Sequence, residues 1–183
     1  MVDEEPWYSE LRLRWKPENV RLLMIAESAP DDRGDPAARR FFYADRLGHD
    51  NLFRAVVEAT YGVGKETLKQ TGKKPWLEKL RRDGFYLIDL AEFPVNAMNA
   101  ADRRRVLIDS IPGCVDRAST LDPAGAIIVK ANLYAILAPP LRGANVNVLQ
   151  EGPIAFPLGN TRADFVEQFN RAKSKSKARL GAN

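Results

Sequence analysis

Four short apolar segments along the chain have the pattern of strands that are buried on both faces. They cover residues 20–26, 85–91, 126–129 and 146–149. Continuous apolar runs of this length are typical of strands in parallel sheets, where helices cover both faces. We therefore predict a central sheet of four parallel strands.

Apolar positions at helical spacing separate these segments. One stripe runs from residue 52 to 61, between Asp50, a good N-cap, and Gly62. Further helices are expected over residues 76–80, over 106–121 with an interruption or a break at Pro112-Gly113, over 132–137 before Pro139-Pro140, and after Thr161, which forms a capping-box pattern with Asp164. The basic segment 173–179 has no apolar face, and we expect it to be frayed or disordered.

Strands that alternate with helices imply right-handed crossovers and a three-layer α/β/α sandwich. The 183 residues fit one domain, over 1–183, because no repeat or flexible linker divides them. A single cysteine, Cys114, excludes an internal disulfide and any multi-cysteine metal or iron-sulfur site. No apolar run approaches the ~20 residues that a bilayer requires, and the acidic start lacks a signal-peptide pattern. We expect a cytoplasmic protein with no membrane partner.

Charge adds one expectation about partners. The formal net charge is +4 and the sequence pI is about 9.3. A basic excess of this kind favours a polyanionic partner such as DNA, and a solvated basic surface is the alternative.

Polar residues follow the first predicted strand, at the edge of the sheet where open α/β folds bind ligands. Glu27, Asp31 and Asp32 supply three carboxylates, and Phe41 and Phe42 follow them. A carboxylate there can orient or deprotonate a water molecule, and an aromatic ring can stack on a planar ligand. The alternative is that the aromatic residues belong to the core and the aspartates cap the loop.

The order of these motifs resembles the uracil-DNA glycosylase superfamily. The resemblance covers the layout of residues 20–172 and is carried by four motifs: Ala-Glu-Ser-Ala-Pro at 26–30, Phe-Phe-Tyr at 41–43, Leu-Ile-Asp-Leu-Ala at 87–91, and Phe-Pro-Leu-Gly-Asn-Thr-Arg at 156–162. It implies a fold of that family and an enzyme that flips uracil out of DNA. The expected class has no iron-sulfur cluster.

The first motifs imply roles for several residues. Glu27 matches a glutamate of the iron-sulfur glycosylases that positions water, whereas Ala29 and Pro30 depart from their Pro-Gly ending. By the resemblance, Phe42 or Phe41 stacks on uracil. Asp89 stands where the family commonly uses asparagine to read the base. An ionised aspartate only accepts hydrogen bonds, so it suits the ring N–H but repels O4 unless it is protonated or bridged by a donor. Ser28 completes this part of the expected substrate site.

The late motif implies contacts with DNA. Residues 156–160 stand where the family has His-Pro-Ser-Pro-Leu, so the catalytic histidine has no counterpart. Its role is to donate to uracil O2 as the base departs, and Asn160, Arg162 or Lys130 can replace it. We expect the DNA contacts at Pro157, Leu158, Asn160 and Arg162. Leu158 resembles the wedge that enters the duplex, or else packs in the core. Arg162 binds a phosphate, or else is a plain surface arginine.

Lys130 ends the third predicted strand and Asn132 follows it, and both are expected in the substrate site. A lysine after an apolar run is costly to bury unpaired, so we expect Lys130 in the crevice or paired with Glu27 or Asp89. A structural ion pair is the competing explanation. His49, the only histidine, excludes a His-His metal motif, and its position is more typical of a surface residue than of a base. The segment 62–67 follows a helix, so it is not a phosphate loop.

Together these features predict a monofunctional uracil-DNA glycosylase of base excision repair. It would act on single- or double-stranded DNA as a monomer, release free uracil and leave an abasic site, and it would need neither cofactor nor metal. Two alternatives stay open: a non-catalytic protein of the same fold that binds abasic or damaged DNA, and a small-molecule hydrolase on a generic α/β scaffold.

Overall fold

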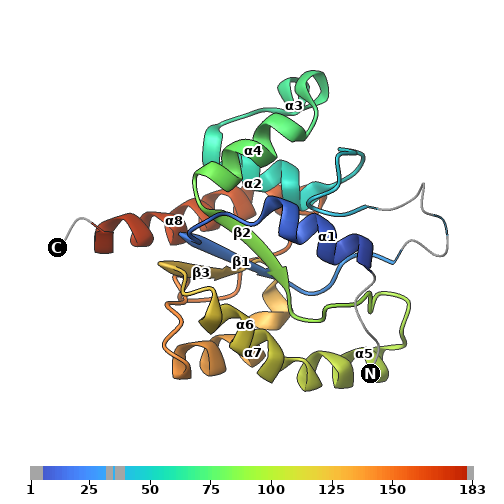
Figure 1. The fold of residues 1–183 in the computed structure, drawn as a ribbon, viewed down its shortest axis with the longest axis vertical. Coiled ribbons are helices and arrows are strands. Elements are labelled where there is room, and N and C mark those ends of the chain that lie inside the picture. The colour runs from blue at the N-terminus through green and yellow to red at the C-terminus, as the bar shows by residue number, and fades with distance from the viewer. Residues whose placement is uncertain (1–5, 32–34, 36–39, 181–183) are drawn as a thin grey trace.

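Three parallel strands form the sheet, in the order β2-β1-β3 (Figure 1). The computed structural model describes residues 6–31, 35 and 40–180. Its elements in chain order are α1 (Pro6–Trp15), β1 (Leu22–Ala26), α2 (Asn51–Tyr61), α3 (Lys65–Thr71), α4 (Lys74–Arg82), β2 (Phe85–Asp89), α5 (Ala100–Asp109), α6 (Ile111–Thr120), β3 (Gly125–Ile128), α7 (Ala131–Gly143), the short 3-10 helix η2 (Gly159–Thr161) and α8 (Arg162–Leu180).

Helices cover both faces of the sheet, which explains why its strands are apolar except for Asp89 at the end of β2. Helices α1, α2, α4 and α8 lie on one side of the strands, and α5, α6 and α7 lie on the other (Figure 1). All five residues of β1 and all four of β3 are buried. The mixed α/β class is therefore as predicted. None of the helices in the described part of the chain has the length and apolar character that a membrane crossing needs.

The predicted fourth strand does not form, so the expectation of a four-stranded sheet was wrong. Residues 146–149 run beside β3 but make only one bridge, between Ala126 and Val148. One residue later the side chain of Gln150 replaces the backbone as the partner of β3. Its Oε1 accepts from the N–H of Ile128 at 2.7 Å, and its Nε2 donates to the carbonyl of Ile128 at 2.8 Å. A buried amide thus closes this edge of the sheet.

A tyrosine closes the opposite edge of the sheet. The hydroxyl of Tyr43 accepts from the N–H of Leu87 at 2.5 Å and donates to the carbonyl of the same residue at 3.1 Å. Because Leu87 lies in the edge strand β2, this contact fastens the Phe-Phe-Tyr segment along the sheet. The aromatic cluster is thereby held next to the end of the strand.

Most predicted helices form, with boundaries that tertiary contacts adjust. Helix α2 begins after Asp50, whose Oδ1 accepts from the N–H of Phe53 at 2.9 Å, and ends at Gly62 with a φ of 68°. The region 106–121 breaks at Ser110, so Pro112 lies in the first turn of α6 rather than at an interruption. A proline is tolerated there because first-turn N–H groups have no helical acceptor.

Two expectations about helix ends were wrong. Helix α7 continues through Pro139 and Pro140 to Gly143, because its buried face, which includes Leu137 and Leu141, packs in the core and offsets the lost hydrogen bonds. The hydroxyl of Thr161, expected in a capping box with Asp164, instead contacts the preceding loop: it donates to the carbonyl of Phe156 at 2.6 Å and accepts from the N–H of Leu158 at 3.0 Å. The basic segment 173–179 is part of the continuous helix α8.

Replacing Gln150 by leucine tests whether its amide closes the sheet. Gln150→Leu leaves the N–H and carbonyl of Ile128 buried without partners, so we expect a loss of about 2 to 4 kcal/mol in the free energy of unfolding. Urea denaturation measures this loss, with the exposed Gln70→Leu as the control expected to change little. A Gln150→Leu protein as stable as the wild type would contradict this account of the edge.

Candidate functional site

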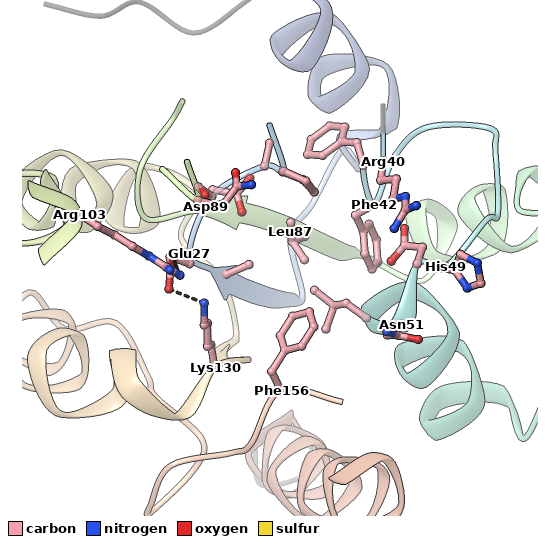
Figure 2. Close-up of a pocket in the computed structure, with 18 residues that line it drawn as sticks. Glu27, Arg40, Phe42, His49, Asn51, Leu87, Asp89, Arg103, Lys130 and Phe156 are labelled. Atoms are coloured by element: carbon pink, nitrogen blue, oxygen red, sulfur yellow. Dashed lines mark hydrogen bonds and ion pairs between the residues drawn. The ribbon is translucent and has the colours of Figure 1, made fainter. Parts of the chain in front are cut away.

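Two buried acids end neighbouring strands at the same edge of the sheet (Figure 2). Strands β1 and β2 pair in parallel with Ala26 opposite Asp89, and Glu27 directly follows β1. The N–H of Ala91 donates to the carbonyl of Glu27 at 2.9 Å, which extends the pairing past the strand ends. A cavity of about 340 Å³ opens at this edge, and both acids line it. We call it the strand-end cavity.

Glu27 is held between two cations from opposite sides. Its Oε1 accepts from Nη2 of Arg103 on α5, and its Oε2 accepts from Nζ of Lys130 at 2.5 Å. Burial alone would raise the pKa of the Glu27 carboxyl, but the hydrogen bonds and charges of Lys130 and Arg103 outweigh it and lower that pKa. The expected pairing of Lys130 with Glu27 is thus confirmed, whereas the contribution of Arg103 was not foreseen.

Asp89 is also paired, with a cation from the start of the chain. Nη2 of Arg12 on α1 donates to Oδ2 of Asp89, whose side chain is only 3% exposed. Burial raises the pKa of Asp89, and the Arg12 guanidinium opposes that rise. Arg117 of α6 donates to the Asp89 carbonyl at 2.9 Å and so fixes the end of β2. The backbone and one carboxylate oxygen of Asp89 are therefore held in place.

Phe41 and Phe42 line the strand-end cavity and are also part of the core. Phe41 packs edge-to-face on Tyr43 with ring centroids 5.5 Å apart, and Phe42 packs in the same manner on Phe53 at 5.4 Å. Both rings are almost completely buried, at 3% and 6% exposure. Both rings therefore pack in the core and form part of the cavity wall. Their stacking on a planar ligand stays a prediction.

A buried lysine fixes the segment that carries these rings. Nζ of Lys73 donates to the carbonyl of Phe41 and to Oδ2 of Asp50, each at 2.8 Å. The Lys73 side chain is fully buried, and burial lowers its pKa while Asp50 opposes the shift. Since Asp50 also caps α2, one lysine joins the aromatic segment to the start of that helix.

The strand-end cavity has an apolar middle between two polar ends. Figure 2 shows Phe42, Leu87 and Phe156 between the Glu27 cluster on one side and Arg40, His49 and Asn51 on the other. Phe156, the first residue of the late sequence motif, thus contributes its ring to this apolar middle. His49, expected at the surface, is exposed and also belongs to the lining.

Two amide side chains in the lining of the strand-end cavity were also not predicted from the sequence. Asn96 and Asn51 both line the cavity, and Oδ1 of Asn96 accepts from the N–H of Asp31 at 2.8 Å. Ser28 lies in the lining as expected, and its Oγ accepts from the N–H of Val95 at 3.4 Å. These contacts join the loops that follow β1 and β2. Short loop residues of this kind give no periodic signal in the sequence.

Several predicted site residues lie elsewhere. Asp31 and Asn132 do not line the cavity, and Asp32 lies outside the described residues. Nε and Nη2 of Arg162 both donate to Oε2 of Glu58, at 2.8 and 2.6 Å, so this arginine joins α8 to α2.

Of the late motif, Phe156 lines the cavity, whereas the four residues expected to contact DNA do not. Pro157 is buried and Asn160 is exposed, and neither is in the lining. Leu158 is 55% exposed, which excludes the core-packing alternative for it. The loop therefore presents one apolar side chain to solvent.

Within residues 6–31, 35 and 40–180, no three or more His, Cys, Asp or Glu side chains gather as a metal site would require. Comparison with known proteins adds no relative: no family model matches the chain, and no curated protein matches it either.

The ion pairs of Glu27 predict a stability that depends on pH. Because its folded-state pKa lies below the unfolded value, this contribution is full above roughly pH 5 and is lost as the pH falls through the folded-state pKa. We expect Glu27→Gln to cost about 1 to 3 kcal/mol at neutral pH and progressively less toward about pH 3. Urea unfolding across this range measures the difference.

The exposed pair of Glu66 and Lys69 supplies the control. Its carboxylate is 76% exposed, so Glu66→Gln should change the unfolding free energy by less than about 0.5 kcal/mol at every pH. If Glu27→Gln cost the same at low and neutral pH, the lowered pKa of Glu27 would be refuted.

Proposed function

We propose that this protein is a uracil-DNA glycosylase that hydrolyses the N-glycosidic bond of a flipped nucleotide. One observation carries the proposal: a single cavity joins the aromatic residue Phe42 to the acids Glu27 and Asp89 at adjacent strand ends. The resemblance of the four sequence motifs supports it, and a glycosylase-like three-layer fold, a monomeric state and a cytoplasmic location belong to the same proposal.

The polar groups of the cavity match the edge of uracil. Uracil presents an acceptor, a donor and an acceptor at O2, N3–H and O4. Arg12 holds Oδ2 of Asp89, so Oδ1 is the oxygen that accepts from N3–H. Asn96 also lines the cavity, and its amide would supply a donor for O4, which would offset the repulsion between Asp89 and that oxygen. Cytosine has no N–H at N3 and is disfavoured by the same aspartate.

Glu27 would position the attacking water. Its two oxygens each accept one hydrogen bond from a cation and keep a lone pair for a water proton. A carboxylate with a lowered pKa is a weak base, but a weak base suffices here. A water molecule bonded to an oxocarbenium-like C1′ becomes strongly acidic, so orientation matters more than basicity.

Leu158 would enter the duplex where the nucleotide leaves the stack. It lies two residues after Phe156, which lines the cavity, and its side chain is 55% exposed. An apolar side chain presented to solvent beside a cavity suits insertion between bases.

The second candidate is a non-catalytic protein that binds abasic DNA. The presence of Phe156 where the resembled family has its catalytic histidine favours it. Such a protein would retain DNA that carries an abasic-site analogue and would release no base.

Release of uracil tests the proposal directly. Purified protein at stoichiometric concentration should convert a single-stranded oligonucleotide with one uracil into a product that alkali cleaves, and Glu27→Gln should slow this conversion at least about 100-fold. Denaturing electrophoresis measures the product. No conversion above a heat-inactivated control, together with retention of abasic duplex in a gel shift, would favour the binding protein instead.

Leu158→Ala should separate duplex from single-stranded substrates. Because a wedge is needed only where a stack must be held open, we expect a rate about tenfold lower on duplex DNA and unchanged on single strands. Leu13→Ala, at another exposed leucine, should affect neither substrate. Equal losses on both substrates would show that Leu158 has a different role.

A further inference from the structure

We propose that Lys130 stabilises the negative charge on the departing base. The inference rests on the proposed glycosylase function and assigns a catalytic group that the sequence left open among three residues. It follows from the positions of the cations around the strand-end cavity.

The reaction requires such a group. The bond between N1 of uracil and C1′ breaks, and its electron pair stays with the base as an anion delocalised onto O2 and O4. The oxygen of one water molecule bonds C1′, and the proton lost from that water passes by way of Glu27 to the released uracil at N1. Atoms and charges then balance without a co-reactant. A donor near the ring oxygens lowers the energy of the anion as it forms.

Three residues were candidates for the donor to the departing base, and the structure argues against two of them. Both nitrogens of Arg162 that donate are committed to Glu58, and Arg162 is absent from the cavity lining. Asn160 is exposed and does not line the cavity either. Lys130 remains, and it is part of the lining.

Lys130 is anchored firmly at the end of β3. The N–H of the preceding residue, Val129, donates to the carbonyl of Ile25 in β1 at 3.0 Å, and α7 begins at the next residue. Its side chain is 28% exposed, so the ammonium can meet a ligand while its stem is packed. One of its three N–H groups bonds Glu27 at 2.5 Å, and two remain for a ligand.

Arg103 approaches the same carboxylate from another direction. In Figure 2 Lys130 reaches Glu27 from the side of Phe156, whereas Arg103 reaches it from the side of α5. A base that lies against Phe156 therefore meets Lys130 rather than Arg103. This assigns charge stabilisation to Lys130 and makes Arg103 a positioning residue for Glu27.

The dependence of the release rate on the leaving base distinguishes charge stabilisation by Lys130 from positioning of Glu27 by Arg103. The electron-withdrawing fluorine of 5-fluorouracil stabilises the base anion, so its release needs less help from the protein. Single-turnover release of uracil and of 5-fluorouracil from matched single-stranded oligonucleotides should be measured for the wild type, Lys130→Gln, Lys130→Arg and Arg103→Gln. Thermal unfolding reports whether each variant is folded.

We expect Lys130→Gln to slow uracil release about 100-fold but 5-fluorouracil release only about tenfold. Lys130→Arg, which keeps the charge, should restore much of the rate and the wild-type ratio between the two bases. Arg103→Gln should slow both bases equally, because it acts on the water through Glu27.

The experiment distinguishes failure of the proposed function from failure of the role assigned to Lys130. If the wild type releases neither base, the proposed function fails and the role of Lys130 with it. If the wild type is active but a folded Lys130→Gln protein slows both bases equally, the glycosylase function stands and the role of Lys130 in stabilising the leaving group is overturned.

Discussion

The end of the sheet is organised by the need to neutralise two buried carboxylates. Glu27 and Asp89 are brought together because β1 and β2 run in parallel and end in register. An unpaired buried charge is strongly destabilising, so each acid must find a cation. Lys130 and Arg103 supply it for Glu27, and Arg12 supplies it for Asp89. Side chains from α1, from α5 and from the residue just before α7 therefore converge on the ends of β1 and β2.

This constraint also shapes the chemistry that the strand-end cavity can perform. A carboxylate held by two cations has a lowered pKa, so Glu27 is better suited to orient a water molecule than to abstract a proton by its own basicity. The cations that satisfy it remain partly exposed, at 28% for Lys130 and 33% for Arg103. The same groups that stabilise the fold are thereby available to a ligand that develops negative charge.

Local pattern predicted the three strands and several of the helices, but not α1 or α3, whereas long-range contacts decided the sheet edge and much of the site. The three strands that form and the caps of α2 follow from apolar runs and from Asp50 and Gly62, which are signals within a few residues. The predicted fourth strand does not form because the side chain of Gln150, rather than a strand backbone, bonds the backbone of Ile128 in β3. An apolar sequence pattern gives no sign of such a contact. The pairing of Lys130 was foreseen because burying a lone lysine is costly, whichever acid it meets.

Partners far away in sequence gave no comparable signal. Arg12 and Arg103 lie 77 and 76 residues from the acids that they bind. The ion pair of Arg162 was not foreseen, because its partner, Glu58, lies on a helix 104 residues away. Each of these arginines belongs to a helix whose sequence alone would place it on a solvated surface.

A crystal structure of the protein soaked with uracil tests the central claim most directly, namely that the paired acids and the aromatic residues form one site for a planar base. The account predicts density for a ring between Phe42 and Phe156, with N3 within hydrogen-bonding distance of Asp89 and a carbonyl oxygen facing Lys130. A strand-end cavity that stays empty at saturating uracil, or a ring bound away from Asp89, would contradict it.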